Sequence, residues 1–187
     1  MTTPETHWWR ISRQTRKLDA EDMTGSGAKT HGGRWNKPAK AVTYTSTSIS
    51  LAILETLAHL AGVVAIRNSF LVKCTVPDEI WSRRQQVSSD ALLPSWRAQP
   101  AGSKSVRFGD AWLISNTNAL MLIPSVIVPE EYNALVNPAH PDRADFGYGG
   151  TSADLRSTSK NNVVRASKGN RFCGQTFNPA KAPDIPR

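Results

Sequence analysis

Apolar and polar residues alternate along several short stretches of the chain, which is the two-residue period of a half-buried strand. Together with a high content of β-branched and aromatic residues, this alternation predicts strands over residues 7–13, 41–46 and 69–77. Two further stretches are strand-like, residues 110–116 and residues 120–129, and the second is interrupted by Pro124. Residues 14–40 are polar, contain several glycines and are predicted to be mostly loop.

One longer stretch has helical spacing instead. Residues 48–62, SISLAILETLAHLAG, place apolar side chains three and four positions apart, with Ser48 or Ser50 as the N-cap and Gly62 as the stop signal. A weaker helical pattern covers residues 90–99, DALLPSWRAQ. Several strands combined with one strong helix predict an α+β fold.

The chain has the length of one domain, and its character changes after Asp142. A chain of 187 residues is long enough for one hydrophobic core and too short for two comfortable ones. Residues 143–187 are rich in Ser, Asn, Gly and Pro and show little periodicity. We therefore expect one folded domain over residues 1–142. Residues 143–187 are expected to be a basic tail, which is a divergent end, a disordered segment or a frameshifted terminus.

The composition favours a soluble, globular, cytoplasmic protein. Hydrophobic residues make up 39% of the chain and charged residues 20%, and no apolar run approaches the roughly 20 residues that cross a bilayer. The amino-terminal sequence MTTPETHWWR lacks the charged and then apolar pattern of a signal peptide. Cys74 and Cys173 are far apart, and the sequence offers no cluster with the spacing of metal ligands, so no metal is expected.

The net charge of +8 raises the question of nucleic-acid binding. Most of this charge lies in the tail, where eight Lys and Arg residues face three acidic ones. Binding to nucleic acid calls for basic and aromatic residues interleaved on an ordered surface, whereas this tail is low in periodicity. Direct nucleic-acid binding is therefore ranked low.

A pair of glycines beside an arginine marks one candidate binding loop. In HGGRWNKPAK, residues 31–40, Gly32 and Gly33 permit a positive φ or a close approach of the backbone. The planar guanidinium of Arg34 is suited to gripping phosphate oxygens in a bidentate fork. Alone, the pattern equally fits a tight turn with an exposed arginine.

Glu55 is isolated in an apolar region. It is the only formally charged residue between Ala41 and Ile66, on a helix that is apolar around most of its circumference, and such helices are usually buried. One interpretation is a helical pair of Glu55 and His59 on a thin solvent-facing strip. The other is a carboxylate at the edge of a cleft. Burying an unpaired carboxylate costs free energy, so a carboxylate held in such a place indicates a function.

Three other polar residues have weaker signals. Tyr44 lies on the strand before this helix, where it is either an ordinary cross-strand aromatic or a flat ring facing the same cleft. Ser125, Glu130 and Asn133 lie in PSVIVPEEYN, residues 124–133. On composition alone they are loop and turn residues.

Taken together, these pieces resemble the RES-domain family. The order and spacing match as well as the letters, over roughly the first three quarters of the chain. The matching stretches are WRI (9–11), GSGA (25–28), GGRWN (32–36), VTYTSTSISLAILETLAHL (42–60) and PSVIVPEEYNALVNPAHPD (124–142). The family is named for an arginine, a glutamate and a serine, which here are Arg34, Glu55 and Ser125, and Tyr44 falls where the family has its active-site tyrosine.

The resemblance implies an ADP-ribosyltransferase-like fold, a split mixed β-sheet with NAD⁺ bound in the cleft as substrate. It implies that Arg34 holds the pyrophosphate or a neighbouring ribose, that Tyr44 stacks on the nicotinamide and that Glu55 stabilises the oxocarbenium-like charge. Ser125 would orient Glu55 or the ribose. The remaining cofactor-binding candidates are Gly32, Gly33, Asn133 and Arg10, which is a weaker candidate for a phosphate contact.

The resemblance also implies a biological role. It points to a bacterial toxin that depletes NAD⁺ by hydrolysis or phosphorolysis and is neutralised by an Xre-type antitoxin with a helix-turn-helix. One alternative is a mono-ADP-ribosyltransferase that modifies a cellular protein. Another, suggested by the unusual tail, is a catalytically inactive relative that still binds its antitoxin.

Overall fold

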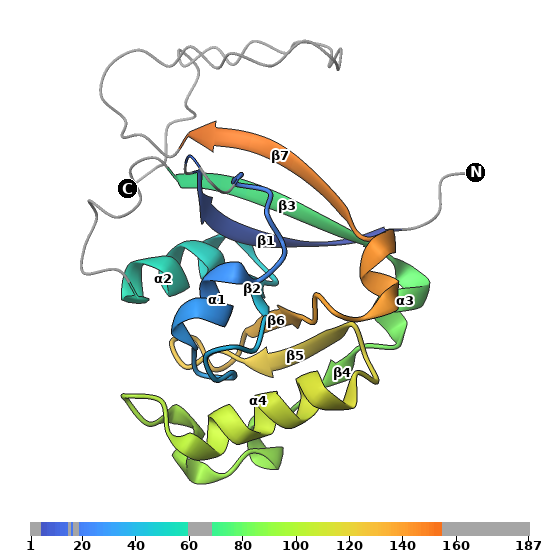
Figure 1. Cartoon of the computed structure of the whole chain (residues 1–187). Helices are drawn as coiled ribbons and strands as arrows, with labels where there is room; N and C mark the ends of the chain where they lie inside the picture. Colours follow the sequence, from blue (N-terminus) through green and yellow to red (C-terminus); the bar gives the residue numbers. More distant parts are fainter. Residues whose placement is uncertain (1–4, 15, 17–18, 60–68, 155–187) are drawn as a thin grey trace, which may run out of the picture. The chain divides into compact units, whose positions relative to one another are not determined.

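The computed structural model describes residues 5–14, 16, 19–59 and 69–154. Within these ranges, seven strands form one mixed sheet in the order β4-β5-β6-β2-β1-β3-β7 (Figure 1). The strands are β1 (Glu5–Arg13), β2 (Thr43–Ser46), β3 (Ser69–Pro77), β4 (Gln85–Gln86), β5 (Leu120–Pro124), β6 (Tyr132–Val136) and β7 (Gly147–Asp154). The helices are α1 (Ser26–His31), α2 (Ile49–His59), α3 (Asp78–Ser82) and α4 (Ser103–Ser115), with short 3₁₀ helices η2 (Ser89–Ala91), η3 (Pro94–Arg97) and η4 (Pro141–Asp145).

The sheet is divided between β1 and β2. On one side, β1 pairs antiparallel with β3 along its whole length, and β3 pairs with β7. On the other side, β2, β6 and β5 pair antiparallel, and β4 joins β5 in parallel. In the described part of the chain, the two sides are linked by the single residue pair Trp9↔Ser46. Two strands joined at one point diverge, and this divergence opens a cleft beside α2.

Strand β5 and the second half of β6 are buried on both faces and divide the core into two clusters. Leu120 and Leu122 of β5 face a cluster that contains Trp8 of β1 and Val72 of β3. The alternate residues Met121 and Ile123 face the second cluster, which packs under α4. The second cluster consists of Trp35, Val42, Val87, Leu92, Trp96, Trp112, Met121, Ile123 and Leu135.

The main sequence predictions of secondary structure are confirmed. The strands expected over residues 7–13, 41–46 and 69–77 are β1, β2 and β3. The expected helix is α2, and Ser48 is its N-cap, because its hydroxyl accepts a hydrogen bond from the Leu51 N–H at 3.1 Å. The proposed stop at Gly62 lies outside the described residues.

Helix α2 is less buried than its composition predicted. Leu51 and Ala52 are its buried residues among those described, whereas Leu54 is 42% exposed. The expectation of a buried helix is therefore wrong for part of its surface. The physical reason is that α2 packs on β1 and β2 through the side that carries Leu51 and Ala52, while Leu54 lies on neither that side nor the cleft wall.

The strand predicted over residues 110–116 is wrong, because these residues belong to α4 up to Ser115. The buried face of this helix consists of small or polar residues at Ser105, Gly109 and Asp110, together with Trp112. Gly109 contacts the loop below so closely that an added Cβ would lie 1.9 Å from the Trp35 carbonyl oxygen. A helix with so small an apolar surface has weak periodicity, which explains the error.

Other differences concern short elements. Residues 26–31, predicted as loop, form α1, and the weak helical pattern over residues 90–99 yields 3₁₀ turns. The strand-like stretch 120–129 ends at Pro124, and the residues around Asn133, which composition assigned to a loop, form β6.

The sheet also extends beyond Asp142. The segment expected to be tail from Arg143 onward contains β7, which pairs with β3 from Thr75↔Gly147 to Phe70↔Asp154. The expected start of the tail is therefore corrected. Residues 155–187 lie outside the described residues, and the description of them as a low-periodicity tail stays a prediction.

Candidate active site

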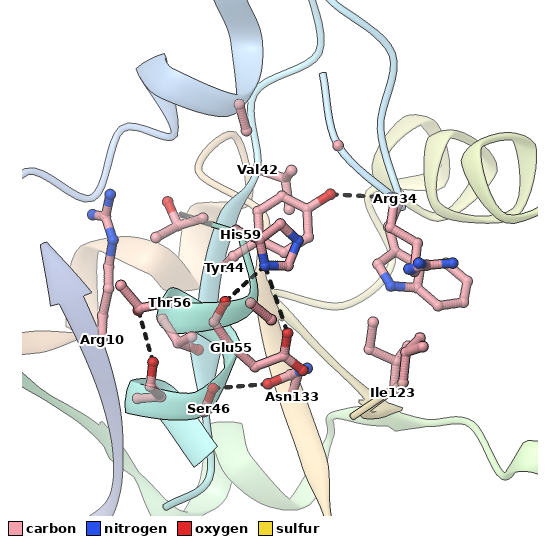
Figure 2. Close-up of a pocket in the computed structure, with 18 of the residues that line it drawn as sticks. Arg10, Arg34, Val42, Tyr44, Ser46, Glu55, Thr56, His59, Ile123 and Asn133 are labelled. Carbon is pink, nitrogen blue, oxygen red and sulfur yellow. Dashed lines mark hydrogen bonds and ion pairs between the residues drawn. The ribbon is translucent and has the colours of Figure 1, made fainter. Parts of the chain in front are cut away.

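A cleft of about 480 Å³ opens where the sheet divides. Its walls come from β1, β2, the loop between α1 and β2, and α2, and its base comes from the ends of β5 and β6. The structure brings most of the sequence-predicted residues into this one cleft: Arg10, Gly32, Gly33, Arg34, Tyr44, Glu55 and Asn133. Figure 2 shows Arg10 and Arg34 on opposite sides, with Tyr44 and Glu55 between them.

Glu55 is held by two hydrogen bonds to one carboxylate oxygen. Ser125 Oγ donates to Glu55 Oε1 at 2.7 Å, and Asn133 Nδ2 donates to the same oxygen at 2.5 Å. Asn133 is fixed in turn by Ser46, whose hydroxyl donates to its Oδ1 at 2.7 Å (Figure 2). Among the described residues, none makes a hydrogen bond to Oε2, so this oxygen is the one available to a ligand.

Ser125 lies behind the cleft rather than in its wall. Its side chain is fully buried, and its oxygen accepts hydrogen bonds from the N–H groups of Ile127 at 3.0 Å and Val128 at 3.1 Å. These two bonds occupy the acceptor positions of the hydroxyl, and its one proton is donated to Glu55. The turn after β5 therefore sets the orientation of the carboxylate on α2.

His59 lies one helical turn after Glu55, at the rim of the cleft. Its side chain is 75% exposed, its Nδ1 lies 2.7 Å from the Glu55 carbonyl oxygen, and the same nitrogen lies 3.9 Å from Glu55 Oε2. The side chain of Glu55 is 19% exposed. Both sequence interpretations of Glu55 therefore apply. The residue has a helical partner in His59, and it also lines the cleft.

Arg34 is anchored to the far wall of the cleft. Its Nη1 donates to the backbone carbonyls of Trp96 at 2.8 Å and Ala98 at 3.0 Å. Partial burial lowers the pKa of Arg34, and the negative charge of Glu55 opposes that shift. An arginine nevertheless stays protonated in a protein. The cleft therefore holds a fixed cation near the Glu55 carboxylate.

The Tyr44 hydroxyl is turned toward the protein. It donates to Asn36 Oδ1 at 2.8 Å and accepts from the Trp35 N–H at 3.0 Å. Burial raises the pKa of Tyr44 well above its ordinary value, although the hydrogen bond from Trp35 and the charge of Arg34 oppose the shift. The phenol stays neutral at physiological pH, and its ring is the part that it presents to the cleft.

The two glycines are required by their immediate surroundings. Gly32 has a φ of 73°, a value that favours glycine. An added Cβ on Gly33 would lie 2.5 Å from Tyr44 Oη and 2.9 Å from Asn36 Oδ1. The absence of a side chain at Gly33 thus leaves room for the tyrosine hydroxyl. An approach of this loop to a dinucleotide stays a prediction.

Arg10 is in the cleft wall but has protein partners of its own. Its Nη1 donates to the Asp22 carbonyl oxygen and lies 3.6 Å from the sulfur of Met23. Burial lowers the pKa of Arg10, and the nearby groups of Cys74 and Asp22 oppose that shift. A phosphate contact by Arg10 stays a prediction.

A family model described as the RES domain matches residues 7–155. The chain belongs to the RES-domain family. It is 46% identical over 137 residues to a Prs ADP-ribosylating toxin of Sphingobium sp. (strain YBL2), covering 73% of this chain and 85% of that protein. It is 36% identical over 125 residues to a protein named Toxin Res of Yersinia enterocolitica, covering 67% of this chain and 80% of that protein.

The fold is also similar to that of a chain in the crystal structure of the M. tuberculosis MbcT–MbcA toxin–antitoxin complex. The TM-score is 0.60 at 16% sequence identity, and the match covers 80% of this chain and 86% of that chain. At this identity the likeness shows the fold alone. The predictions of the RES-domain family and of an α+β fold with a mixed sheet are confirmed, and the prediction of an enzyme agrees with a family that includes an ADP-ribosylating toxin.

Sequence reasoning missed several residues of this RES-domain cleft. Asn36 and Ser46 connect predicted residues to one another, and Trp9 and Gln99 line the wall. Asn36 stands inside the quoted GGRWN motif, which was the available signal. The role of Ser46 depends on its pairing with Asn133 across β2 and β6, which the local sequence does not reveal.

Two features are absent from the described residues. Within the described ranges, no three or more His, Cys, Asp or Glu side chains are grouped so that they would hold a metal ion. In the same ranges, no helix has the length and apolar character needed to cross a membrane.

Proposed function

We propose that this RES-domain protein is a toxin that cleaves the nicotinamide–ribose bond of NAD⁺ and depletes cellular NAD⁺ by hydrolysis or phosphorolysis. The observation that carries the proposal is the Glu55 carboxylate, oriented by Ser125 and Asn133 through one oxygen while the other stays available in the cleft. Such a preorganised charge suits a reaction in which positive charge develops on the substrate.

In the proposed reaction, the bond between the nicotinamide nitrogen and ribose C1′ breaks, and its electron pair leaves with the nicotinamide, which becomes neutral. The ribose acquires oxocarbenium-like positive charge, as in glycoside cleavage. Glu55 Oε2 is placed to stabilise that charge or to bind a ribose hydroxyl. Water or phosphate then forms the new bond at C1′, and a water nucleophile releases a proton.

Other residues of the cleft are assigned to binding. The guanidinium of Arg34 has nitrogens besides Nη1 with which to bind the pyrophosphate or a ribose. The Tyr44 ring provides a flat surface for the nicotinamide, and its hydroxyl is occupied by Asn36 and Trp35. Ser125 is a positioning residue, because it acts on the substrate through Glu55.

The test is nicotinamide release from NAD⁺ by the purified full chain, beside Glu55→Gln. Glutamine keeps an oxygen that accepts from Ser125 and Asn133 but removes the negative charge. We expect kcat to fall by roughly 10²–10³-fold or more, as for other preorganised electrostatic groups. A loss of nicotinamide release in Glu55→Gln also shows that the activity belongs to this protein and not to a contaminating enzyme.

Glu131→Gln is the matched control. Glu131 is also half-buried and also accepts a serine hydrogen bond, from Ser48 Oγ at 2.7 Å, but it does not line the cleft. Its kcat is expected to stay near that of the wild type. Equal release by the wild type and Glu55→Gln would contradict the assignment, and absence of release from a folded wild type would reject the proposed reaction.

A second candidate, mono-ADP-ribosylation of a cellular protein, is favoured by one comparison. The Sphingobium relative, 46% identical to this chain, is named a Prs ADP-ribosylating toxin. Both reactions begin by releasing nicotinamide and differ in the acceptor at C1′. NAD⁺ labelled in its adenine ring distinguishes them: transfer leaves label on a protein of a cell extract, whereas hydrolysis yields free ADP-ribose and phosphorolysis its phosphate ester.

We further propose that an antitoxin of the Xre type neutralises this chain. The support is the name Toxin Res among its relatives and the presence of an antitoxin in the structurally similar complex. A catalytically inactive role is ranked lower, because Arg34, Tyr44, Glu55 and Ser125 are assembled as one site. Expression of the wild type or Glu55→Gln, each with and without a co-expressed candidate antitoxin of the Xre type, tests both points by growth.

A further inference from the structure

Asn36 is almost completely buried and bonds to several parts of the chain at once. It is 1% exposed. Its Nδ2 donates to the carbonyl oxygens of Ala28 at 2.9 Å, Lys40 at 2.9 Å and Lys37 at 3.1 Å. Its Oδ1 accepts the hydroxyl proton of Tyr44 at 2.8 Å. One side chain thus joins α1, the loop and β2.

The backbone is fixed by hydrogen bonds on both sides of Arg34. On one side, the Gly33 N–H donates to the main-chain carbonyl oxygen of Asn36 at 2.9 Å. On the other side, the Trp35 N–H donates to the Tyr44 hydroxyl at 3.0 Å, and that hydroxyl is in turn bound to Asn36. The arginine is therefore held between two hydrogen bonds, and the one at Trp35 depends on the Asn36 side chain through the Tyr44 hydroxyl.

We propose that Asn36 is a positioning residue that holds the Tyr44 ring and the Arg34 guanidinium in the geometry that binds NAD⁺. The inference rests on the proposed function and deepens it. An amide suits this position because its oxygen accepts the tyrosine proton while its nitrogen donates to the loop carbonyls. Aspartate would face those carbonyls without a proton to donate, and leucine would leave them and the tyrosine hydroxyl without partners.

The first experiment compares Asn36→Ala with Asn137→Ala in the full chain. Asn137 is also 1% exposed and bonds to Asn116 Oδ1 at 2.8 Å and to the Ala139 N–H at 3.1 Å. Unlike Asn36, which bonds to Tyr44 in the cleft wall, it has no such bond to a residue that lines the cleft. Both variants lose a buried amide, so both are expected to lose stability. We expect Asn36→Ala alone to reduce kcat/KM for nicotinamide release, on the order of 10- to 100-fold.

The effect of Asn36→Ala is expected mainly in KM, because Tyr44 and Arg34 are assigned to binding and Glu55 keeps its own hydrogen bonds. A double-mutant cycle with Tyr44→Phe locates the link, since this variant keeps the ring and removes the hydroxyl. The double variant should be no more than about twofold worse than Asn36→Ala, because both changes break the same contact. Additive losses, or equal losses in Asn36→Ala and Asn137→Ala, would overturn the proposal.

A second readout does not depend on turnover. Amide hydrogen exchange at Trp35 should accelerate in Asn36→Ala and stay unchanged in Asn137→Ala. If the wild type releases no nicotinamide, the proposed function fails. The exchange measurement then remains as the test of whether Asn36 positions the loop. If Asn36→Ala does not fold, Tyr44→Phe takes its place, and faster Trp35 exchange with a raised KM is then expected. Unchanged exchange at Trp35 would reject the positioning role.

Discussion

At the scale of single residues, the candidate site depends on how one carboxylate is oriented. A glutamate on an exposed helix samples many side-chain positions, and fixing it costs conformational entropy. Ser125 and Asn133 both bond Glu55 Oε1, although they lie 70 and 78 positions away in the sequence. The entropy is therefore lost during folding and not during the reaction, which is the advantage of a preorganised site.

Ser125→Ala tests this orientation. The substitution removes the proton donor to Glu55 and leaves the N–H groups of Ile127 and Val128 without their acceptor. We expect kcat to fall about 10-fold or more with a smaller change in KM, and stability to fall by about 1–3 kcal/mol. Ser105→Ala is the control, because the buried Ser105 hydroxyl has no hydrogen-bond partner among the described residues. Unchanged kcat in Ser125→Ala would show that Glu55 needs no such support.

At the scale of elements, the cleft depends on how α4 packs on the loop that carries Arg34. Gly109 lets the helix approach the Trp35 carbonyl, and the Asp110 carboxylate accepts the Lys37 N–H at 3.0 Å. Trp35 packs edge-to-face against Phe108 with ring centroids 6.0 Å apart. The helix thus supports the loop from beneath, at the residue next to Arg34.

Gly109→Ala should separate these two elements. The added Cβ would lie 1.9 Å from a backbone oxygen, which cannot rotate away, so the helix or the loop has to move. We expect a loss of about 1–3 kcal/mol in the free energy of unfolding, together with a lower kcat/KM. Gly102→Ala has no atom within 4 Å of the new Cβ and is expected to be near neutral. Urea denaturation of both variants measures the difference in stability. Equal midpoints for Gly109→Ala and Gly102→Ala would contradict the role assigned to Gly109.

The elements that the sequence predicted correctly are those whose local pattern agrees with their packing. Strands β1 and β3 alternate because one face of each is buried, and α2 begins at a serine cap. Helix α4 was mistaken for a strand because its contact surface uses Gly109 and Ser105, which carry no hydrophobic period. Tertiary approach, and not local preference, determines that segment.

The site shows a similar division. Glu55 and Arg34 were found because each is unusual in its own neighbourhood, one as an isolated charge and the other beside two glycines. Tyr44 had only a weak signal of its own, and Ser125 received a role only from the resemblance to a known family. The role of Asn36 depends on three carbonyl groups and a hydroxyl that meet only in the folded loop. The spacing of residues along the sequence does not predict that these groups meet, so the role of Asn36 could not be predicted.

At the scale of the whole molecule, the sheet needs its last strand. Strand β7 covers the edge of β3, and Phe146 just before it packs edge-to-face on Trp8 at 5.6 Å between ring centroids. A chain ending at Asp142 loses both and should unfold at a much lower temperature, since removal of one buried phenylalanine side chain alone costs about 3–5 kcal/mol. A chain ending at Ser157 keeps the described strands and is the control. Equal melting temperatures for the two would contradict this role for β7.

The buried thiol of Cys74 links the stability of the whole molecule to alkaline pH. Cys74 is completely buried, and burial raises the pKa of its thiol from 9.0 to about 12, with the charge of Arg10 opposing the shift. Burial likewise raises the pKa of Tyr148 from 10.0 to about 12. Above pH 9, the unfolded chain therefore releases protons that the folded chain retains.

The free energy of unfolding should accordingly be highest below the unfolded thiol pKa of 9.0 and fall as the pH rises toward about 12. Each group that ionises only in the unfolded state contributes a slope of up to about 1.4 kcal/mol per pH unit. Urea denaturation under reducing conditions at pH values between about 7 and 10.5 measures this slope. Cys74→Ala leaves a small cavity and lowers stability at every pH, but it removes one of the titrating groups. Its slope above pH 9 should therefore be shallower than that of the wild type, and parallel slopes would show that the folded protein does not suppress ionisation of this thiol.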